Sequence, residues 1–183
     1  MLQRRKQGNR RPDRGLLRLW NKSVAFHGRG CRDLAIGVRV CETVLDRFGL
    51  DPETCRGRLV CVSESDGCAV DAIQTALGCT MGEKHLLFFN TGRLIFSVYD
   101  LQQEQSLRLC VRDRVSEGAF SPEEILLMDR SDLFYFEEAR PMTVRVRKKA
   151  TRGCTGNREI ISRPMGSIHD SLEPFREFDE SKF

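Results

Sequence analysis

The chain has 183 residues, 40% of them apolar, which is enough for one domain with a hydrophobic core and a small appendage at most. Its net charge of +4 is uneven, because residues 1–22 hold eight Lys or Arg against one Asp and the rest of the chain is slightly acidic. No apolar run approaches the length of a membrane span, and residues 15–20 are too short for the apolar part of a secretory signal. We therefore expect neither a membrane protein nor a secreted one.

The eight cysteines could indicate disulfides. However, the chain is too long for a small disulfide-stapled scaffold and carries no secretory signal. We expect free thiols in a reducing cytoplasm.

The first predicted element is a basic arm at residues 1–22, rich in Arg, Gln and Asn up to residue 14. Leu16–Trp20 could begin a short amphipathic helix that packs on the body. The arm is either solvated and anchored by its Trp, or contacts nucleic acid or another anionic surface.

The clearest helix covers Asp33–Phe48, where apolar residues recur with helical spacing. Asp33 is the expected N-cap, and Gly49 follows the expected end. Alternating side chains then predict a strand over Arg58–Glu64. A turn at residues 65–67 leads into a second helix over Cys68–Leu77.

Strands and turns dominate the next segment. Two apolar strands, Leu86–Phe89 and Leu94–Tyr99, flank residues 90–93 (NTGR), which favour a hairpin turn. A third strand is predicted over Ser106–Val111. Helices mixed with hairpin strands favour an α+β or mixed α/β fold over a regular βαβ repeat.

Residues 121–124 (SPEE) combine an N-cap serine, a proline at the first helical position and an acid two residues later. They predict a helix over Ile125–Met128, and Leu133–Phe136 is expected to form a further helical turn. Met142–Arg147 alternates as an edge strand would, and the pattern fades after Lys149.

Cys68 is the strongest candidate for chemistry, because it begins a predicted helix, where the helix dipole favours a thiolate. Asp71 lies one turn later on nearly the same face. The thiolate could be a nucleophile or a ligand for a soft metal, and Asp71 an acid/base group, a ligand or a support for one. The alternative is a small buried cysteine and a local cap.

His27 and Cys31 form an H-x3-C pair in a glycine-containing loop, which could provide two zinc ligands or contain only a structural histidine. Arg29 and Arg32 flank Cys31 and would either favour its thiolate or hold an anionic substrate. Cys79, after Gly78, is a possible further sulfur ligand.

The other cysteines show no ligand spacing, and Cys41 and Cys61 fit core positions. The chain has no C-x-x-C, G-x-G-x-x-G, P-loop or H-E-x-x-H motif. A second basic stretch, residues 140–163, has few aromatic residues for base stacking, so nucleic-acid binding is not favoured.

Three linked segments resemble the FmdE-like family of formylmethanofuran dehydrogenase subunits. Its F-H-G-H-x-C-P-G-L-A-x-G loop is matched by residues 26–37 (FHGRGCRDLAIG), and its acidic turn with C-x-x-D-A-I-Q by residues 64–74 (ESDGCAVDAIQ). Its G-C-T-x-G is matched by residues 78–82 (GCTMG). Order and spacing agree over about residues 22–140.

The resemblance implies a single α+β domain with a mixed sheet flanked by helices, and a site for zinc or another transition metal around the His/Cys loop and the C-x-x-D helix start. The chain lacks the cysteines of the zinc finger that some members add. It also carries Arg29 where the family has a second histidine and Arg32-Asp33 where it has Pro-Gly. The metal site is therefore expected to be weaker, remodelled, or replaced by an anion-binding thiol site.

We thus expect a core domain at 23–150 between the basic arm and a partly flexible extension at 151–183. The leading hypothesis is a metal or thiolate site formed by His27, Cys31, Cys68 and Cys79. The protein would act on a small molecule in, or accessory to, the redox or one-carbon metabolism of molybdenum- or tungsten-type enzymes. The alternative is a non-catalytic module for metal binding or subunit interaction that docks an acidic partner through its basic segments, and a homodimer is compatible with either.

Overall fold

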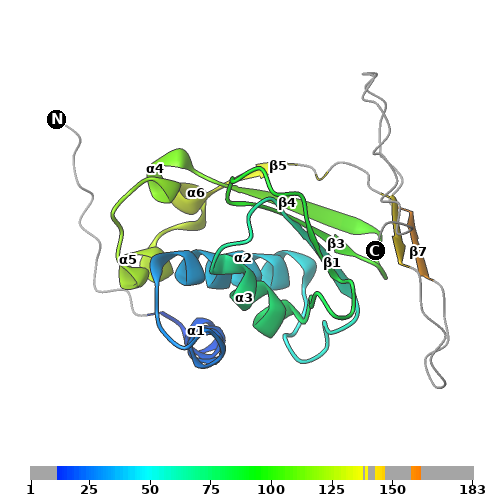
Figure 1. Ribbon diagram of the computed structural model, residues 1–183. Helices are drawn as coiled ribbons and strands as arrows, with labels where there is room; N and C mark the ends of the chain where they lie inside the picture. Colours follow the sequence, from blue (N-terminus) through cyan, green and yellow to red (C-terminus); the bar gives the residue numbers. More distant parts are fainter. Residues whose placement is uncertain (1–11, 138, 140–142, 147–157, 162–183) are drawn as a thin grey trace.

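Figure 1 shows a computed structural model of the chain, which describes residues 12–137, 139, 143–146 and 158–161. Helices α1 (Arg14–His27) and α2 (Arg32–Phe48) come first. Helix α1 continues past residue 22, so the described part of the basic arm is helical and reaches the expected core. The Asp13 carboxylate caps α1 by accepting a hydrogen bond from the backbone N–H of Leu16 at 2.7 Å.

The junction between α1 and α2 differs from the sequence expectation in two ways. His27 is the last residue of α1 rather than a loop residue, and Gly28 ends the helix at a φ of 88°. The N-cap of α2 is Cys31 and not Asp33, because the Cys31 sulfur accepts the N–H of Leu34 at 3.4 Å. A cysteine is an unusual cap, which is why the aspartate looked like the better candidate.

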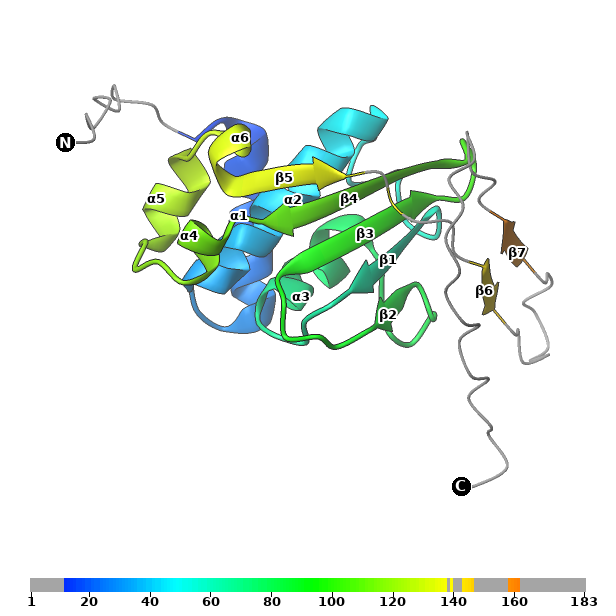
Figure 2. The same ribbon diagram turned by 90° about the horizontal axis from the view of Figure 1, so that it is seen from above.

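The main sheet has five strands in the order β2-β1-β3-β4-β5. Their bounds are β1 Leu59–Ser63, β2 Leu86–Phe88, β3 Ile95–Asp100, β4 Gln105–Val111 and β5 Phe134–Glu137. Strands β1 and β2 are parallel and the other neighbours antiparallel. In Figure 2 this mixed sheet lies over α2 and α3, so the expected α+β fold is confirmed.

The predicted hairpin over residues 86–99 is wrong. Strand β1 lies between β2 and β3, with its Cys61 opposite Leu86 on one side and Val98 on the other. Residues 90–93 still turn, but they cross the end of β1, where the N–H groups of Thr91 and Gly92 donate to the Glu64 carbonyl.

The helical turn predicted over residues 133–136 is also wrong. Helix α6 (Arg130–Leu133) ends where that turn was expected to begin, and β5 follows it directly. Phe134 is buried and pairs with Val111 of β4, so burial at the sheet edge determines the conformation.

The predicted helix over residues 68–77 is present in two parts. An α-helical turn, α3 (Ala69–Ala72), continues as a π-helix, η1 (Ile73–Leu77). Buried thiols satisfy carbonyl groups along it, because Cys41 donates to Ala72 O at 3.4 Å and Cys55 to Leu77 O at 3.5 Å. The core position predicted for Cys41 is confirmed.

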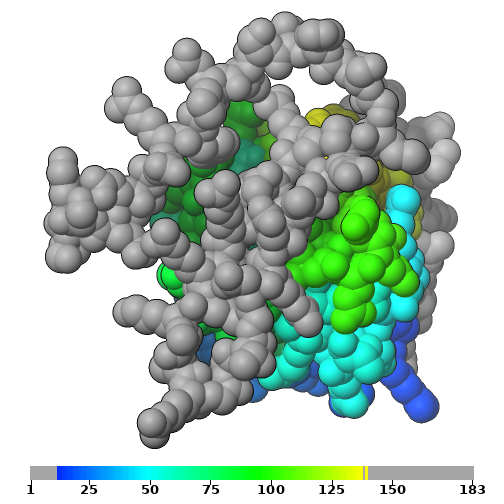
Figure 3. All heavy atoms as spheres, turned by 90° about the vertical axis from the view of Figure 1, so that its right-hand side faces the viewer, coloured from blue at the N-terminus to red at the C-terminus, as the bar shows by residue number. Residues whose placement is uncertain are grey.

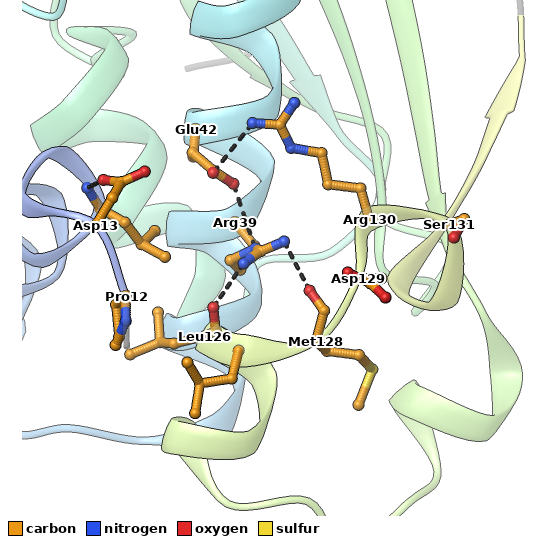
Figure 4. A pocket seen from close by; sticks show the side chains of 11 residues that line it. Pro12, Asp13, Arg39, Glu42, Leu126, Met128, Asp129, Arg130 and Ser131 are labelled. Carbon is orange, nitrogen blue, oxygen red and sulfur yellow. Dashed lines mark hydrogen bonds and ion pairs between the residues drawn. The ribbon is translucent and has the colours of Figure 1, made fainter. Parts of the chain in front are cut away.

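Two short helices, α4 (Asp113–Ser116) and α5 (Pro122–Leu127), follow the sheet. The predicted start of α5 is confirmed, with a complete capping box between Ser121 and Glu124. Figure 4 shows Arg39 of α2 at the C-terminal end of α5. The buried guanidinium donates to Leu126 O at 2.6 Å and Met128 O at 2.8 Å.

At the end of the sheet opposite α5 lies the turn between β3 and β4. Figure 3, viewed from the right of Figure 1, shows this turn (green) against the segment that follows α2 (cyan). Leu101 N–H donates to Arg58 O at 3.0 Å, and the Arg58 guanidinium pairs with Asp100.

Beyond the main sheet, β6 (Thr143–Val146) and β7 (Arg158–Ile161) form a separate antiparallel pair. The strand predicted at 142–147 is therefore present, with a partner that the sequence did not predict. Most of residues 1–14 and of the basic stretch 140–163 lies outside the described residues. No helix in the described part of the chain is long and apolar enough to cross a membrane.

Candidate metal-binding site

Three ligand-type side chains meet where three helices converge. His27 ends α1, Cys31 caps α2, and Cys68 lies at the N-cap of α3. One ligand atom from each lies within 4.8 Å of the others, and all three residues are partly buried. The predicted placement of Cys68 at a helix start is confirmed.

Asp71 orients the histidine of this group. Its Oδ2 lies 2.6 Å from His27 Nδ1, and the His27 side chain is only 14% exposed. Because a carboxylate accepts, Nδ1 is the donor in this contact, and in a neutral imidazole that leaves the lone pair on Nε2. That Nε2 lies 3.7 Å from the Cys31 sulfur, so it faces the thiols as a metal ligand would.

The pKa of Cys68 is raised, contrary to the expectation that a helix start would favour its thiolate. Burial of the thiol is the main cause, and the hydrogen bond and charge of Cys31 and the charge of Asp33 add to it. Burial therefore disfavours the free thiolate of Cys68, and metal binding would require loss of the thiol proton.

Cys79 does not join this group. It is fully buried, and its thiol donates to Leu59 O at 3.4 Å. Burial, together with Cys61 and Cys55, also raises the pKa of Cys79. We therefore leave Cys79 out of the ligand set.

The two arginines beside Cys31 differ in whether their side chains have partners within the described residues. Arg32 is held by Asp33, with Nε and Oδ1 2.9 Å apart, and by the Gly118 carbonyl, 2.7 Å from Nη1. Arg29 is exposed, and its side chain has no hydrogen bond or ion pair within the described residues. Neither contacts the sulfurs or His27 through a hydrogen bond or ion pair given by the structure, so their expected role toward an anion stays a prediction.

Sequence reasoning missed the supports behind Asp71. Gln74 donates to its Oδ1 at 3.5 Å, and Thr75 donates to its backbone carbonyl at 2.9 Å. The Thr75 hydroxyl also meets Ser23 of α1 at 3.1 Å. The Ser23–Thr75 contact joins residues far apart in the chain, so no local motif indicates it.

Two sulfurs and one imidazole nitrogen suit zinc and similar transition metals. In a tetrahedral metal site, these three residues would leave the fourth position for water or a substrate, as in many catalytic zinc sites. The partial exposure of the three residues is compatible with access to that position.

Comparison with known proteins places the chain in a family and finds individual proteins that are similar to it. The FmdE family, described as "FmdE, Molybdenum formylmethanofuran dehydrogenase operon", matches residues 26–133. A probable S-adenosyl-L-methionine-binding protein from Archaeoglobus fulgidus is 25% identical over 122 residues, which are 65% of this chain and 33% of that protein. The chain thus spans about a third of the length of this curated relative.

A solved structure is also similar, that of a tungsten formylmethanofuran dehydrogenase FmdE-like protein from Syntrophus aciditrophicus. The match covers 80% of this chain and 86% of that one, with 18% identity and a TM-score of 0.49.

Proposed function

This chain belongs to the FmdE family, and we propose that it binds zinc or another transition metal through His27, Cys31 and Cys68. In this proposal the protein works in the cytoplasm, in or alongside the redox or one-carbon chemistry of molybdenum- or tungsten-type enzymes. The family name, taken from a formylmethanofuran dehydrogenase operon, supports that setting.

The observation that carries the proposal is the geometry around His27. Asp71 Oδ2 lies 2.6 Å from Nδ1, Nε2 lies 3.7 Å from the Cys31 sulfur, and one ring nitrogen of His27 lies within 4.8 Å of both thiol sulfurs. A carboxylate behind a ligating histidine fixes its tautomer and raises its basicity.

The residues divide into ligands and a positioning group. Cys31, Cys68 and His27 donate electron pairs, and Asp71 fixes the imidazole ring without being a ligand itself. A bound metal would supply Lewis acidity to a small molecule at the free fourth position. The alternative role of Cys68, a metal-free nucleophile, requires a low thiol pKa, and its pKa is raised.

Metal binding is tested on the full chain, purified without a tag under anaerobic conditions. Elemental analysis and zinc titration should give about one metal ion per chain in the wild type and little or none in Cys68→Ser. Cys110→Ser is the matched control, because Cys110 is also partly buried but lies outside the ligand group.

Circular dichroism establishes that each variant is folded. The proposal is wrong if the wild type binds no transition metal, or if folded Cys68→Ser keeps the wild-type affinity.

The second candidate function is that of a docking module for an acidic partner. It is favoured by α1, on which Arg14, Arg18 and Lys22 recur every fourth residue and are all exposed. Such a basic stripe binds an acidic surface in a salt-dependent way.

Retention on a poly-L-glutamate matrix tests this stripe. We expect the wild type to elute at higher salt than a variant with Arg14→Glu and Lys22→Glu. Replacement of exposed Arg56 and Lys84 by Glu changes the net charge by the same amount and is the control. Equal elution of the stripe variant and this control variant would contradict this function.

A further inference from the structure

A cavity of about 860 Å³ lies beside the proposed metal site but contains none of its ligands. Its near end is lined by Arg32 and Asp33, which directly follow Cys31, and by Ser65, three residues before Cys68. This volume is in the range of pockets that enclose small molecules.

The floor of the cavity belongs to the face of the sheet that turns away from α2. Along β4, Leu109 is fully buried in the core, whereas its neighbour Cys110 is partly exposed and lines the cavity. Tyr135 of β5 lies opposite Cys110 and lines the cavity too. Side chains alternate between the two faces of a sheet, so Cys110 and Tyr135 lie on the face opposite Leu109.

Several charges in the cavity already have partners inside the protein. Arg32 is paired with Asp33. Arg108 uses its guanidinium on Glu64, at 2.6 Å, on Glu137, at 3.2 Å, and on the Ser97 hydroxyl, at 3.0 Å. These groups have little capacity left for a ligand.

Three lining charges remain. The guanidinium of Arg93 and the carboxylates of Asp113 and Glu117 have no hydrogen bond or ion pair with any described residue. Arg93 precedes β3 and the two acids belong to α4 and its end, so the two signs come from different elements. A ligand that matches this set carries one negative and two positive charges.

We propose that the cavity binds an α-amino acid with a second cationic group, a zwitterion of net charge +1. Its carboxylate is held by Arg93, and its two cationic groups by Asp113 and Glu117. The proposal does not need a metal, so it goes beyond the function proposed above. The two unpaired carboxylates repel phosphates and dicarboxylates, which sets the specificity.

Binding is measured by calorimetry on the full chain with L-lysine as the probe. Compared with L-lysine, L-norleucine lacks the second cationic group and cadaverine lacks the carboxylate. Inorganic phosphate tests binding of an anion alone. L-lysine should bind at least about tenfold more tightly than each of the three. Phosphate binding above lysine, or no binding of any probe, would overturn the proposal.

Variants test the location. Arg93→Gln should weaken L-lysine binding at least about tenfold. Glu117→Gln should also weaken it and should reduce the difference between the affinities for L-lysine and L-norleucine. Both residues are exposed, so the variants should fold. Arg56→Gln, exposed and outside the cavity lining, is the control and should bind L-lysine as the wild type does. Unchanged binding in Arg93→Gln would place the ligand elsewhere.

Cysteine alkylation separates this proposal from the metal site. L-lysine should slow alkylation of Cys110 by N-ethylmaleimide, whereas zinc should slow that of Cys31 and Cys68. Protection of Cys110 without any effect of zinc would support the cavity and contradict the metal site. Protection of Cys31 and Cys68 by zinc, without protection of Cys110 by L-lysine, would support the metal site and contradict the cavity proposal.

Discussion

At His27, one hydrogen bond decides what the ring can do. The contact with Asp71 assigns the proton to Nδ1, so Nε2 is the nitrogen that faces Cys31. An amide at residue 71 could still hold the ring, but it would remove the negative charge that makes the imidazole a stronger donor.

Asp71→Asn is therefore expected to lower the affinity for zinc by about 10- to 100-fold without unfolding the protein. Competition with a chromophoric chelator measures the affinity. Asp66→Asn is the control, because Asp66 is an exposed acid in the turn before α3 and has no partner among the described residues. Equal losses in the two variants would show a general effect of charge and contradict a positioning role for Asp71.

At the residue scale, the sequence predicts well which side chains come together. It predicts their orientation and their pKa values less well. The spacing around His27, Cys31, Cys68 and Asp71 follows the family motifs, and the structure brings these four together. Cys79 belongs to a third motif but faces the core. Neither its direction nor the raised pKa of Cys68 is visible in the sequence, because both depend on burial by distant segments.

Among the elements, α2 and α3 approach each other very closely at Gly37. A Cβ atom there would lie 2.3 Å from the Ala69 carbonyl oxygen, which is too close for any real contact. Ala69 directly follows Cys68, so this approach positions the start of α3, which carries Cys68, against α2, which Cys31 caps. The glycine thus connects helix packing to the geometry of the site.

Gly37→Ala should push the two helices apart, lowering the free energy of unfolding by about 1–3 kcal/mol and weakening zinc binding. Urea unfolding and chelator competition measure the two effects. Gly82→Ala is the control, because a Cβ there meets nothing within 4 Å. A folded Gly37→Ala variant with unchanged zinc affinity would disprove the link between this contact and the site.

The strand pairing shows where local patterns stop being informative. Periodicity located β1, β2, β3 and β4 closely, but the turn at residues 90–93 wrongly joined β2 to β3. β1 pairs between them through long-range contacts, and this position buries residues on both faces of that strand. Similarly, β5 resembles a helical turn until its pairing with β4 is known.

At the scale of the whole molecule, few charged side chains are buried among the described residues, and one enclosed ion pair lies at the end of the sheet opposite α5. Arg58 donates two hydrogen bonds to Asp100, at 2.8 and 2.6 Å, and the Asp100 side chain is fully buried. This pair joins the segment before β1 to the end of β3, so its charge state should affect global stability.

Burial raises the pKa of Asp100, but hydrogen bonds from Arg58, from the backbone of Gln102 and Gln103 and from the side chain of Gln105 outweigh it and lower the pKa to about 2. An unfolded aspartate titrates near 3.9. The stabilisation is therefore complete above about pH 5 and is lost as the pH falls through about 2, with a size of about 2 kcal/mol.

Urea unfolding of the wild type and Asp100→Asn at several pH values tests this dependence. The wild type should be more stable by a margin that is constant from pH 7 to about pH 5 and shrinks by about 2 kcal/mol on acidification to pH 2. Glu53→Gln is the control, because the ion pair of Glu53 with Arg18 is exposed and should contribute little at any pH. A margin that does not change with pH would mean that Asp100 stabilises the fold through its shape and hydrogen bonds rather than through its charge.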